Sequence, residues 1–185
     1  MARVGDFYQP QNQPVFQQLI QQQGDVKMQF LNEGEAGFDT GPMGGCTSVV
    51  AKVGDTVLGQ HCGGGLGALD MDQFLDAIED AVDEDDEDRI IVTVLPSIVA
   101  DHGAGKERMA LDSGLTGVPL PLQQRQRAEN MTYTEQTKLV ELINHLRNEH
   151  PGNYEVRVTD QCNRATIDRN MNVRMGGPQV AHGLR

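Results

Sequence analysis

The residues best suited to covalent chemistry lie in the stretch TGPMGGCTSVVAKVGDTVLGQHCGGG, from Thr40 to Gly65, which holds Cys46 and His61. A free thiol is mostly protonated at neutral pH, and a neighbouring imidazole activates it by forming an ion pair or taking its proton. The two residue types together predict nucleophilic attack on a carbonyl carbon. The prediction requires a fold that brings the two side chains together.

The sequence around the pair predicts a β-hairpin. The turn Val53–Thr56 fits a two-residue loop, because its central Gly-Asp pair tolerates positive φ. That turn sets Ser48 opposite His61, and Cys46 shares a face with Ser48 because side chains alternate along a strand. We therefore expect Cys46 and His61 to be diagonal neighbours on one face, which long side chains can bridge.

Two further features of the stretch support a thiol-dependent site. Gly44 and Gly45 precede Cys46, so the turn leaves room for a substrate and offers backbone N–H groups to a developing oxyanion. The imidazole of His61 needs a third group to hold its tautomer. We expect the Thr40 hydroxyl, or a backbone carbonyl nearby, to accept that hydrogen bond.

These residues carry a resemblance to two enzyme families. A Thr six residues before the Cys, a glycine-rich turn and a His at the end of the next strand resemble the chemoreceptor glutamine deamidases. The Gly directly before the Cys and the His fifteen residues after it are similar to the catalytic domain of the cytotoxic necrotizing factor toxins. The resemblance covers only residues 40–65, and this chain has Gly44 where the toxins usually have Ser.

The resemblance implies a cysteine-dependent deamidase that converts a glutamine of a target protein to glutamate, as in bacterial toxins and effectors. It implies Cys46 as nucleophile, His61 as general base and acid, and Thr40 as the group that orients His61. Two other functions stay open. One is a cysteine protease or transglutaminase with the same dyad, and the other is a non-enzymatic acidic interaction protein in which Cys46 is a buried structural thiol.

Other site types are disfavoured. Residues 63–68 have the G-x-G-x-x-A spacing of a dinucleotide-binding turn, but the strand before them is expected to be the return strand of a hairpin. A metal site at Cys46, His61 and Cys62 is disfavoured because adjacent strand residues point to opposite faces and no fourth ligand is evident. We expect neither a cofactor nor a metal.

Composition excludes several classes of partner. With 27 acidic and 15 basic residues the formal charge is −12, which argues against binding to nucleic acid or to an anionic membrane surface. No apolar run reaches the length of a membrane span, and the first residues lack the apolar core of a secretory signal peptide. The odd number of cysteines favours a reducing compartment. We expect a cytoplasmic protein, or one exported into a target cell by another route.

The remaining pattern predicts a single α+β domain, with a mixed or antiparallel, sandwich-like β-sheet and two main helices. We expect a flexible arm over 1–12, the domain over 13–176 and a flexible tail over 177–185. Helical periodicity and capping boxes predict the main helices over 71–82 and 133–150. Lesser expectations are a short helix over 14–24, an acidic loop over 83–88, a surface excursion over 100–130, and strands over 25–32, 89–100, 154–160 and 165–175.

Overall fold

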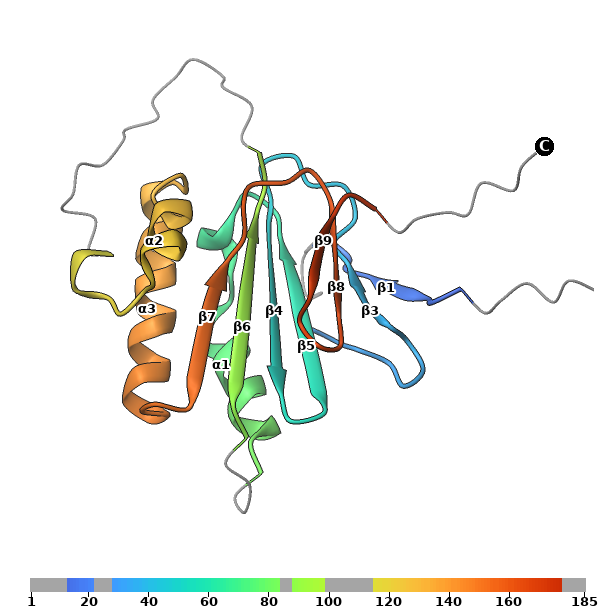
Figure 1. Ribbon diagram of the computed structural model, residues 1–185, viewed down its shortest axis with the longest axis horizontal. Helices are drawn as coiled ribbons and strands as arrows, with labels where there is room; N and C mark the ends of the chain where they lie inside the picture. The colour runs from blue at the N-terminus through green and yellow to red at the C-terminus, as the bar shows by residue number, and fades with distance from the viewer. Residues whose placement is uncertain (1–12, 22–27, 84–87, 99–114, 178–185) are drawn as a thin grey trace, which may run out of the picture.

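The computed structural model describes residues 13–21, 28–83, 88–98 and 115–177. In these ranges the chain forms one α+β domain with two mixed sheets (Figure 1). The larger sheet has the order β2 (Gln29–Phe30), β5 (Thr56–Cys62), β4 (Thr47–Val53), β6 (Ile90–Pro96), β7 (Tyr154–Val158). The smaller sheet has the order β1 (Phe16–Gln18), β3 (Gly37–Asp39), β8 (Ala165–Asp168), β9 (Val173–Met175). The helices are α1 (Met71–Ala81), α2 (Leu122–Ala128) and α3 (Tyr133–Glu149), with short 3-10 turns η1 (Leu66–Ala68) and η2 (Leu115–Gly117).

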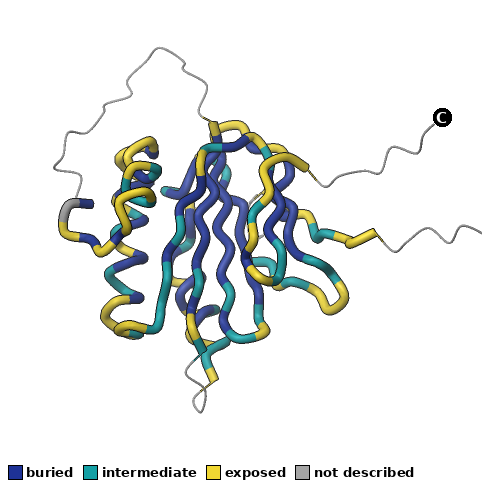
Figure 2. Tube along the Cα trace, in the orientation of Figure 1, coloured by how far each residue is buried: buried dark blue, intermediate teal, exposed yellow. Residues whose placement is uncertain are grey.

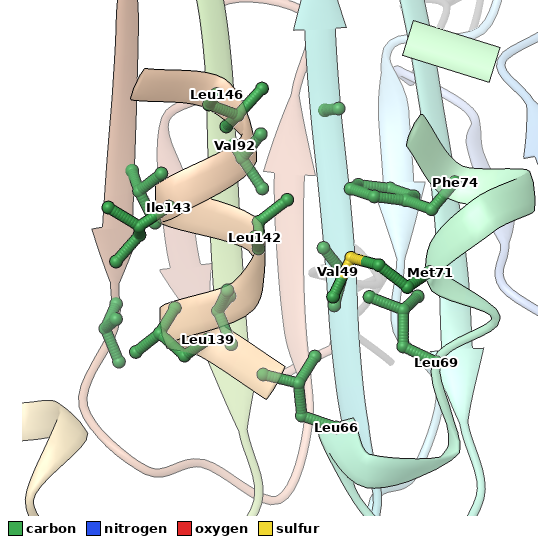
Figure 3. Close-up of a cluster of buried hydrophobic side chains, with 14 of the residues drawn as sticks. Val49, Leu66, Leu69, Met71, Phe74, Val92, Leu139, Leu142, Ile143 and Leu146 are labelled. Atoms are coloured by element: carbon green, nitrogen blue, oxygen red, sulfur yellow. The ribbon is translucent and has the colours of Figure 1, made fainter. Parts of the chain in front are cut away.

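The larger sheet is the middle layer of the domain. One of its faces packs against α1, α3 and η1, and this apolar core is drawn in Figure 3. Its other face packs against the smaller sheet through a second, smaller apolar cluster. The central strands are buried on both sides, whereas the outer surfaces of the helices are exposed (Figure 2). The two main helices therefore lie on one face of the sheet that contains residues 90–96.

The predicted hairpin is confirmed. β4 and β5 pair antiparallel with Val53 opposite Thr56 and Ser48 opposite His61. Gly54 in the turn has a φ of 54°, a conformation that glycine adopts without steric cost. β6 then pairs antiparallel with β4 on one side and parallel with β7 on the other, so its apolar run lies inside the sheet and is flanked by strands on both sides.

Both helix starts follow their capping residues. At α3 the Thr132 side chain accepts from the backbone of Glu135, and the Glu135 carboxylate accepts from the backbone of Thr132, which completes the capping box. At α1 the Asp70 carboxylate accepts from the backbone N–H of Gln73. The reciprocal bond of a capping box, in which the Gln73 side-chain oxygen accepts from the Asp70 N–H, is absent among the described residues. The capping box at α1 is therefore incomplete.

The expected helix over 14–24 is wrong. Residues 16–18 form β1, which pairs parallel with β3, and Gln21 forms a parallel bridge with His61. A short isolated helix is only marginally stable, whereas this segment gains ladder hydrogen bonds and buries Leu19 completely between the sheets. Tertiary pairing thus overrides the helical spacing of its apolar residues.

Two further expectations need correction. The excursion over 100–130 includes a helix, α2, whose Ala128 is fully buried against the core. The segment 165–175 is two paired strands, β8 and β9, rather than one. Expectations for residues 1–12, 84–87, 99–114 and 178–185, and for the start of the predicted strand over 25–32, fall outside the described residues. In the described part of the chain, no helix has the length and apolar character needed to cross a membrane.

Candidate active site

Cys46 lies immediately before β4, on the face of the larger sheet that packs against the smaller sheet. Its side chain belongs to the inter-sheet apolar cluster, and the residue is 6% exposed. The backbone carbonyl of Cys46 accepts from the N–H of Ser97 at 3.0 Å, which ties this end of β4 to the end of β6. The thiol makes one weak contact, 3.9 Å from the carbonyl oxygen of Gly44. The sulfur is therefore held in place by packing rather than by strong hydrogen bonds.

His61 projects from β5 into the same inter-sheet layer and is 3% exposed. Its Nδ1 lies 2.8 Å from the carbonyl oxygen of Thr40. A carbonyl can only accept, so this contact places a proton on Nδ1 and leaves a lone pair on Nε2. Nε2 is buried and has no hydrogen-bond partner among the described residues. This is the tautomer that a general base needs.

Thr40 therefore orients His61 through its backbone, not through its hydroxyl. The hydroxyl is engaged elsewhere, because it accepts from the N–H of Ala165 at 3.0 Å and donates to the carbonyl of Gly41 at 2.8 Å. The N–H of Thr40 in turn donates to the carbonyl of Ala165 at 2.9 Å. Thr40 thus extends the pairing of β3 with β8, and this pairing aims its carbonyl at His61.

An ion pair between the buried Asp39 and the partly exposed Arg164 stiffens the same turn. The guanidinium of Arg164 donates to both carboxylate oxygens of Asp39, and the Asp39 residue is 4% exposed. The hydrogen bond with Asp39 raises the pKa of Arg164. The same carboxylate also accepts from the N–H of Gly41 at 3.0 Å. Gly41 has a φ of 66°, so the chain turns sharply just after the carbonyl that holds His61. The ion pair fixes the turn that presents the acceptor.

Cys46 and His61 share a face, as the sequence predicts, but they are not hydrogen-bonded to each other in this structure. Ser48 lies directly opposite His61, and Cys46 is two residues before Ser48, which makes the pair diagonal neighbours. Diagonal positions are about 7–8 Å apart between backbones and closer at their Cβ atoms. Because the thiol points toward Gly44, rotation of the Cys46 side chain is needed to bring the sulfur to Nε2. Such contacts in resting enzymes often tighten only with substrate.

Gly44 and Gly45 form an open rim beside the thiol. Both are exposed, and a Cβ added to either would meet no atom within 4 Å apart from those of its chain neighbours. Gly45 has a φ of 78°, which favours glycine. Among the described residues no acceptor pairs with the N–H of either glycine. The rim is therefore a place where backbone donors can meet an incoming carbonyl oxygen.

Burial controls the charge of the imidazole. It lowers the pKa of His61 below its ordinary value of 6.5, and the hydrogen bond to the Thr40 carbonyl opposes this shift only in part. His61 is accordingly neutral at pH 7. A neutral imidazole can accept a proton, so the arrangement suits a general base better than a resting ion pair with a thiolate.

The other two cysteines lie in environments that keep them protonated. Cys62 follows His61 but points to the helix-side core, where burial and the nearby Glu135 carboxylate raise its thiol pKa to about 12. Burial raises the pKa of Cys162 to about 11. The opposite facing of His61 and Cys62 agrees with the expectation that disfavoured a shared metal site. No metal-binding cluster occurs in the described ranges.

Two residues that support the site were not singled out from the sequence. Ser97 is buried directly after β6, and its N–H donates to the Cys46 carbonyl. Glu135 is 6% exposed, and besides capping α3 its carboxylate accepts from the Thr47 hydroxyl at 2.6 Å and from the N–H of Leu66 at 3.0 Å. The capping box places Glu135 at the start of a helix. The local sequence does not indicate that the Glu135 carboxylate contacts Thr47 of β4, 88 residues away.

The glycine run after β5 serves packing in this structure. A Cβ at Gly65 would lie 2.8 Å from the Glu135 carboxylate, and one at Gly67 would lie 2.7 Å from the Thr134 side chain. These glycines allow η1 to approach the start of α3 closely. The preceding strand is the return strand of the hairpin, which agrees with the reason given for disfavouring a dinucleotide turn.

The chain matches no protein-family model and no curated protein.

Proposed function

We propose that the protein is a cysteine-dependent glutamine deamidase that acts on a target protein, with Cys46 as nucleophile and His61 as general base and acid. The observation that carries the proposal is the state of the imidazole. Its Nδ1 is held by the Thr40 carbonyl, and its buried Nε2 has no partner on the face that also bears Cys46. Other buried polar atoms of the domain also lack a partner, so the support comes from the combination of a free ring nitrogen, a fixed tautomer and a cysteine on the same face.

The first half-reaction forms an acyl-enzyme. The Cys46 sulfur attacks the side-chain carbonyl carbon of glutamine while Nε2 of His61 takes the thiol proton. The same proton passes to the amide nitrogen as the carbon–nitrogen bond breaks, so ammonia leaves and a thioester remains. The N–H groups of Gly44 and Gly45 are the nearest candidates to stabilise the oxyanion.

The second half-reaction restores the enzyme. His61 Nε2 accepts a proton from water, whose oxygen attacks the thioester carbon, and returns it to the departing sulfur. The product is glutamate, and the net change is one water consumed and one ammonia released per glutamine. The Thr40 carbonyl holds the ring in the same orientation through both steps and stabilises the transient imidazolium.

The burial of Cys46 restricts which substrates fit. A thiol that is 6% exposed cannot be reached by a broad surface, whereas a single extended side chain can enter over the open rim of Gly44 and Gly45. Glutamine has that shape, with its reactive carbon at the end of a flexible aliphatic stem. This accessibility favours attack on a side-chain amide over attack on a main-chain peptide bond.

The test uses a generic substrate and then whole proteins. Purified protein is incubated with carbobenzoxy-glutaminyl-glycine and with candidate target proteins, and ammonia release and intact mass are measured. We expect ammonia and a mass increase that corresponds to replacement of an amide NH₂ by OH, both lost in Cys46→Ser. Peptide cleavage would instead identify a protease, and incorporation of an added amine would identify a transglutaminase. Unchanged turnover in Cys46→Ser would refute the dyad.

A further inference from the structure

The outer edge of β7 is only partly covered. The strand pairs with β6 on one side, and the residues that face β6 are the odd-numbered ones. This follows from two bonds, because the carbonyl of Asn153 accepts from Ile90 and the N–H of Thr159 donates to Val94. The N–H and C=O groups of Tyr154, Val156 and Val158 therefore point outward, away from the sheet.

Side chains of α2 take the place of a neighbouring strand at one end of this edge. The N–H of Val158 donates to the side-chain oxygen of Gln124, and the C=O of Val158 accepts from the Arg127 guanidinium at 3.1 Å. Both outward groups of Val158 are thus satisfied as a partner strand would satisfy them. Among the described residues no group does the same for Tyr154 or Val156.

The loop beside the uncovered part of the edge cannot pair with it as a strand would. Pro119 and Pro121 have no N–H, and the N–H of Leu120 is used by the carbonyl of Val118 at 2.8 Å. This loop, the end of α3 and the turn before β7 enclose a groove of about 500 Å³ along Tyr154 and Val156. The groove is a sheet edge that still has backbone donors and acceptors to offer.

The charge of the groove differs from that of the whole chain. Two arginines line it, Arg147 and Arg157, with one glutamate, Glu155, which is already paired with Arg157 at 2.6 Å. Arg147 donates to the side chain of Asn144, and no carboxylate pairs with it among the described residues. A chain of formal charge −12 therefore presents a cationic group at an open strand edge. That charge favours an acidic ligand.

The geometry points to a docking site for an extended, acidic segment of a partner protein, which adds a strand to β7 and sets a carboxylate near Arg147. Backbone groups at a free edge select extended main chain, and the groove walls select its side chains. A second copy of this chain is the poorer occupant. Antiparallel pairing of two β7 edges would bring the two cationic grooves together without an opposite charge. The inference is independent of the deamidase proposal.

The test uses a fluorescent blocked heptapeptide, acetyl-Thr-Val-Glu-Val-Glu-Val-Thr-amide, with the full-length protein. One control peptide carries Lys in place of both Glu, and another is N-methylated at its central residues so that it cannot pair with a strand. Binding is followed by anisotropy, and hydrogen exchange is measured at the backbone amides of Tyr154 and Val156. We expect one-to-one binding of the acidic peptide, slower exchange at both amides, and at least about tenfold weaker binding of both controls.

Three variants separate the contributions. Arg147→Glu should weaken binding at least about tenfold, whereas Lys138→Glu, the same charge change on the same helix outside the groove, should leave it unchanged. Val156→Pro removes an N–H that points outward and makes no hydrogen bond to β6. It should therefore also weaken binding. Equal binding of the lysine peptide, unchanged exchange at Tyr154 and Val156, or a dimer that already protects these amides without peptide would overturn the proposal. The last outcome would identify a second copy as the occupant.

Discussion

The two faces of the larger sheet carry two buried polar groups, Glu135 and His61, whose hydrogen bonds are satisfied to different extents. On the helix side the buried Glu135 carboxylate accepts from the Thr47 hydroxyl, the N–H of Leu66, and both the N–H and the hydroxyl of Thr132. On the side of the smaller sheet, His61 has one ring nitrogen paired and the other buried without a partner among the described residues. One hairpin contributes to both arrangements, through Thr47 on one face and His61 on the other.

Under the proposed function, the contrast separates a stabilising polar cluster from the place where the chemistry occurs. A buried group whose hydrogen bonds are all made holds its neighbours in place and has no capacity left for chemistry. A buried nitrogen with a free lone pair lowers stability but can take a proton from a thiol or a water. The two thiols of the hairpin follow the same division, since Cys62 lies on the first face and Cys46 on the second.

The largest effect is expected from the thiol on the side of the smaller sheet. Cys46→Ser should reduce glutamine hydrolysis by about a thousandfold or more, because a hydroxyl is a far weaker nucleophile beside a single imidazole. Cys62→Ala on the helix side should keep kcat unchanged despite some loss of stability. Ammonia release and urea unfolding, measured on both variants, check this. Similar activity losses in the two variants would remove the distinction between the faces.

The next largest effect is a loss of stability on the helix side of the larger sheet. Glu135→Ala should lower the free energy of unfolding by about 2–4 kcal/mol, since it leaves several buried donors unpaired at once. Glu135→Gln retains an acceptor oxygen and should lose less. Glu141→Ala, an exposed position on the same helix, is the matched control and should change stability by less than about 0.5 kcal/mol. Urea denaturation of the three variants measures the difference.

Thiol reactivity gives a direct comparison of the three cysteines. At pH 7.5 Cys46 should be alkylated by iodoacetamide at least about a hundredfold faster than Cys162 or Cys62, because burial holds the pKa values of the latter at about 11 and 12. His61→Ala should slow the alkylation of Cys46, because the imidazole is the base that takes the thiol proton, but Cys46 should stay faster than the two thiols of raised pKa. Peptide mapping after timed alkylation distinguishes the sites. Equal rates at all three cysteines would favour a purely structural role for Cys46.

Thr40→Ala should affect stability more than activity. The backbone carbonyl that holds His61 remains, so turnover should fall by less than about threefold. The N–H of Ala165 loses its acceptor, which should lower the free energy of unfolding by about 1–2 kcal/mol. A loss of activity above about tenfold with little change in stability would show that the hydroxyl itself orients the imidazole.

The smallest effect is the pH dependence that His61 adds to stability. Its folded pKa lies below the unfolded value near 6.5, so the unfolded state binds the proton first as the pH falls. Stability should therefore decline from about pH 6.5 down to the folded pKa and then level off for this group. His61→Gln should flatten that part of the unfolding profile. Catalysis should persist below pH 6.5 and disappear only as His61 itself is protonated.

Several features of the fold could be predicted from the sequence because they depend on interactions between residues close together in the chain. The turn Val53–Thr56 sets the hairpin register, and alternation along a strand then places Cys46 and His61 on one face. The capping box at Thr132 marks the start of α3 within the same few residues. Where a distant partner competed with local preference, prediction failed: within the expected helix over 14–24, residues 16–18 pair with β3 as a strand.

The sequence by itself determined which side chains share a face, because turn geometry and strand periodicity act over a few residues. Only the tertiary structure decided what each of those side chains contacts. The acceptor for His61 is a backbone carbonyl aimed by the pairing of Thr40 with Ala165, 125 residues away, and Glu135 reaches Thr47 across 88 residues. Every residue carries a carbonyl, so residue type cannot show which one points at an imidazole. That choice arises when two sheets and a helix pack together, and packing over such separations leaves no local pattern in the chain.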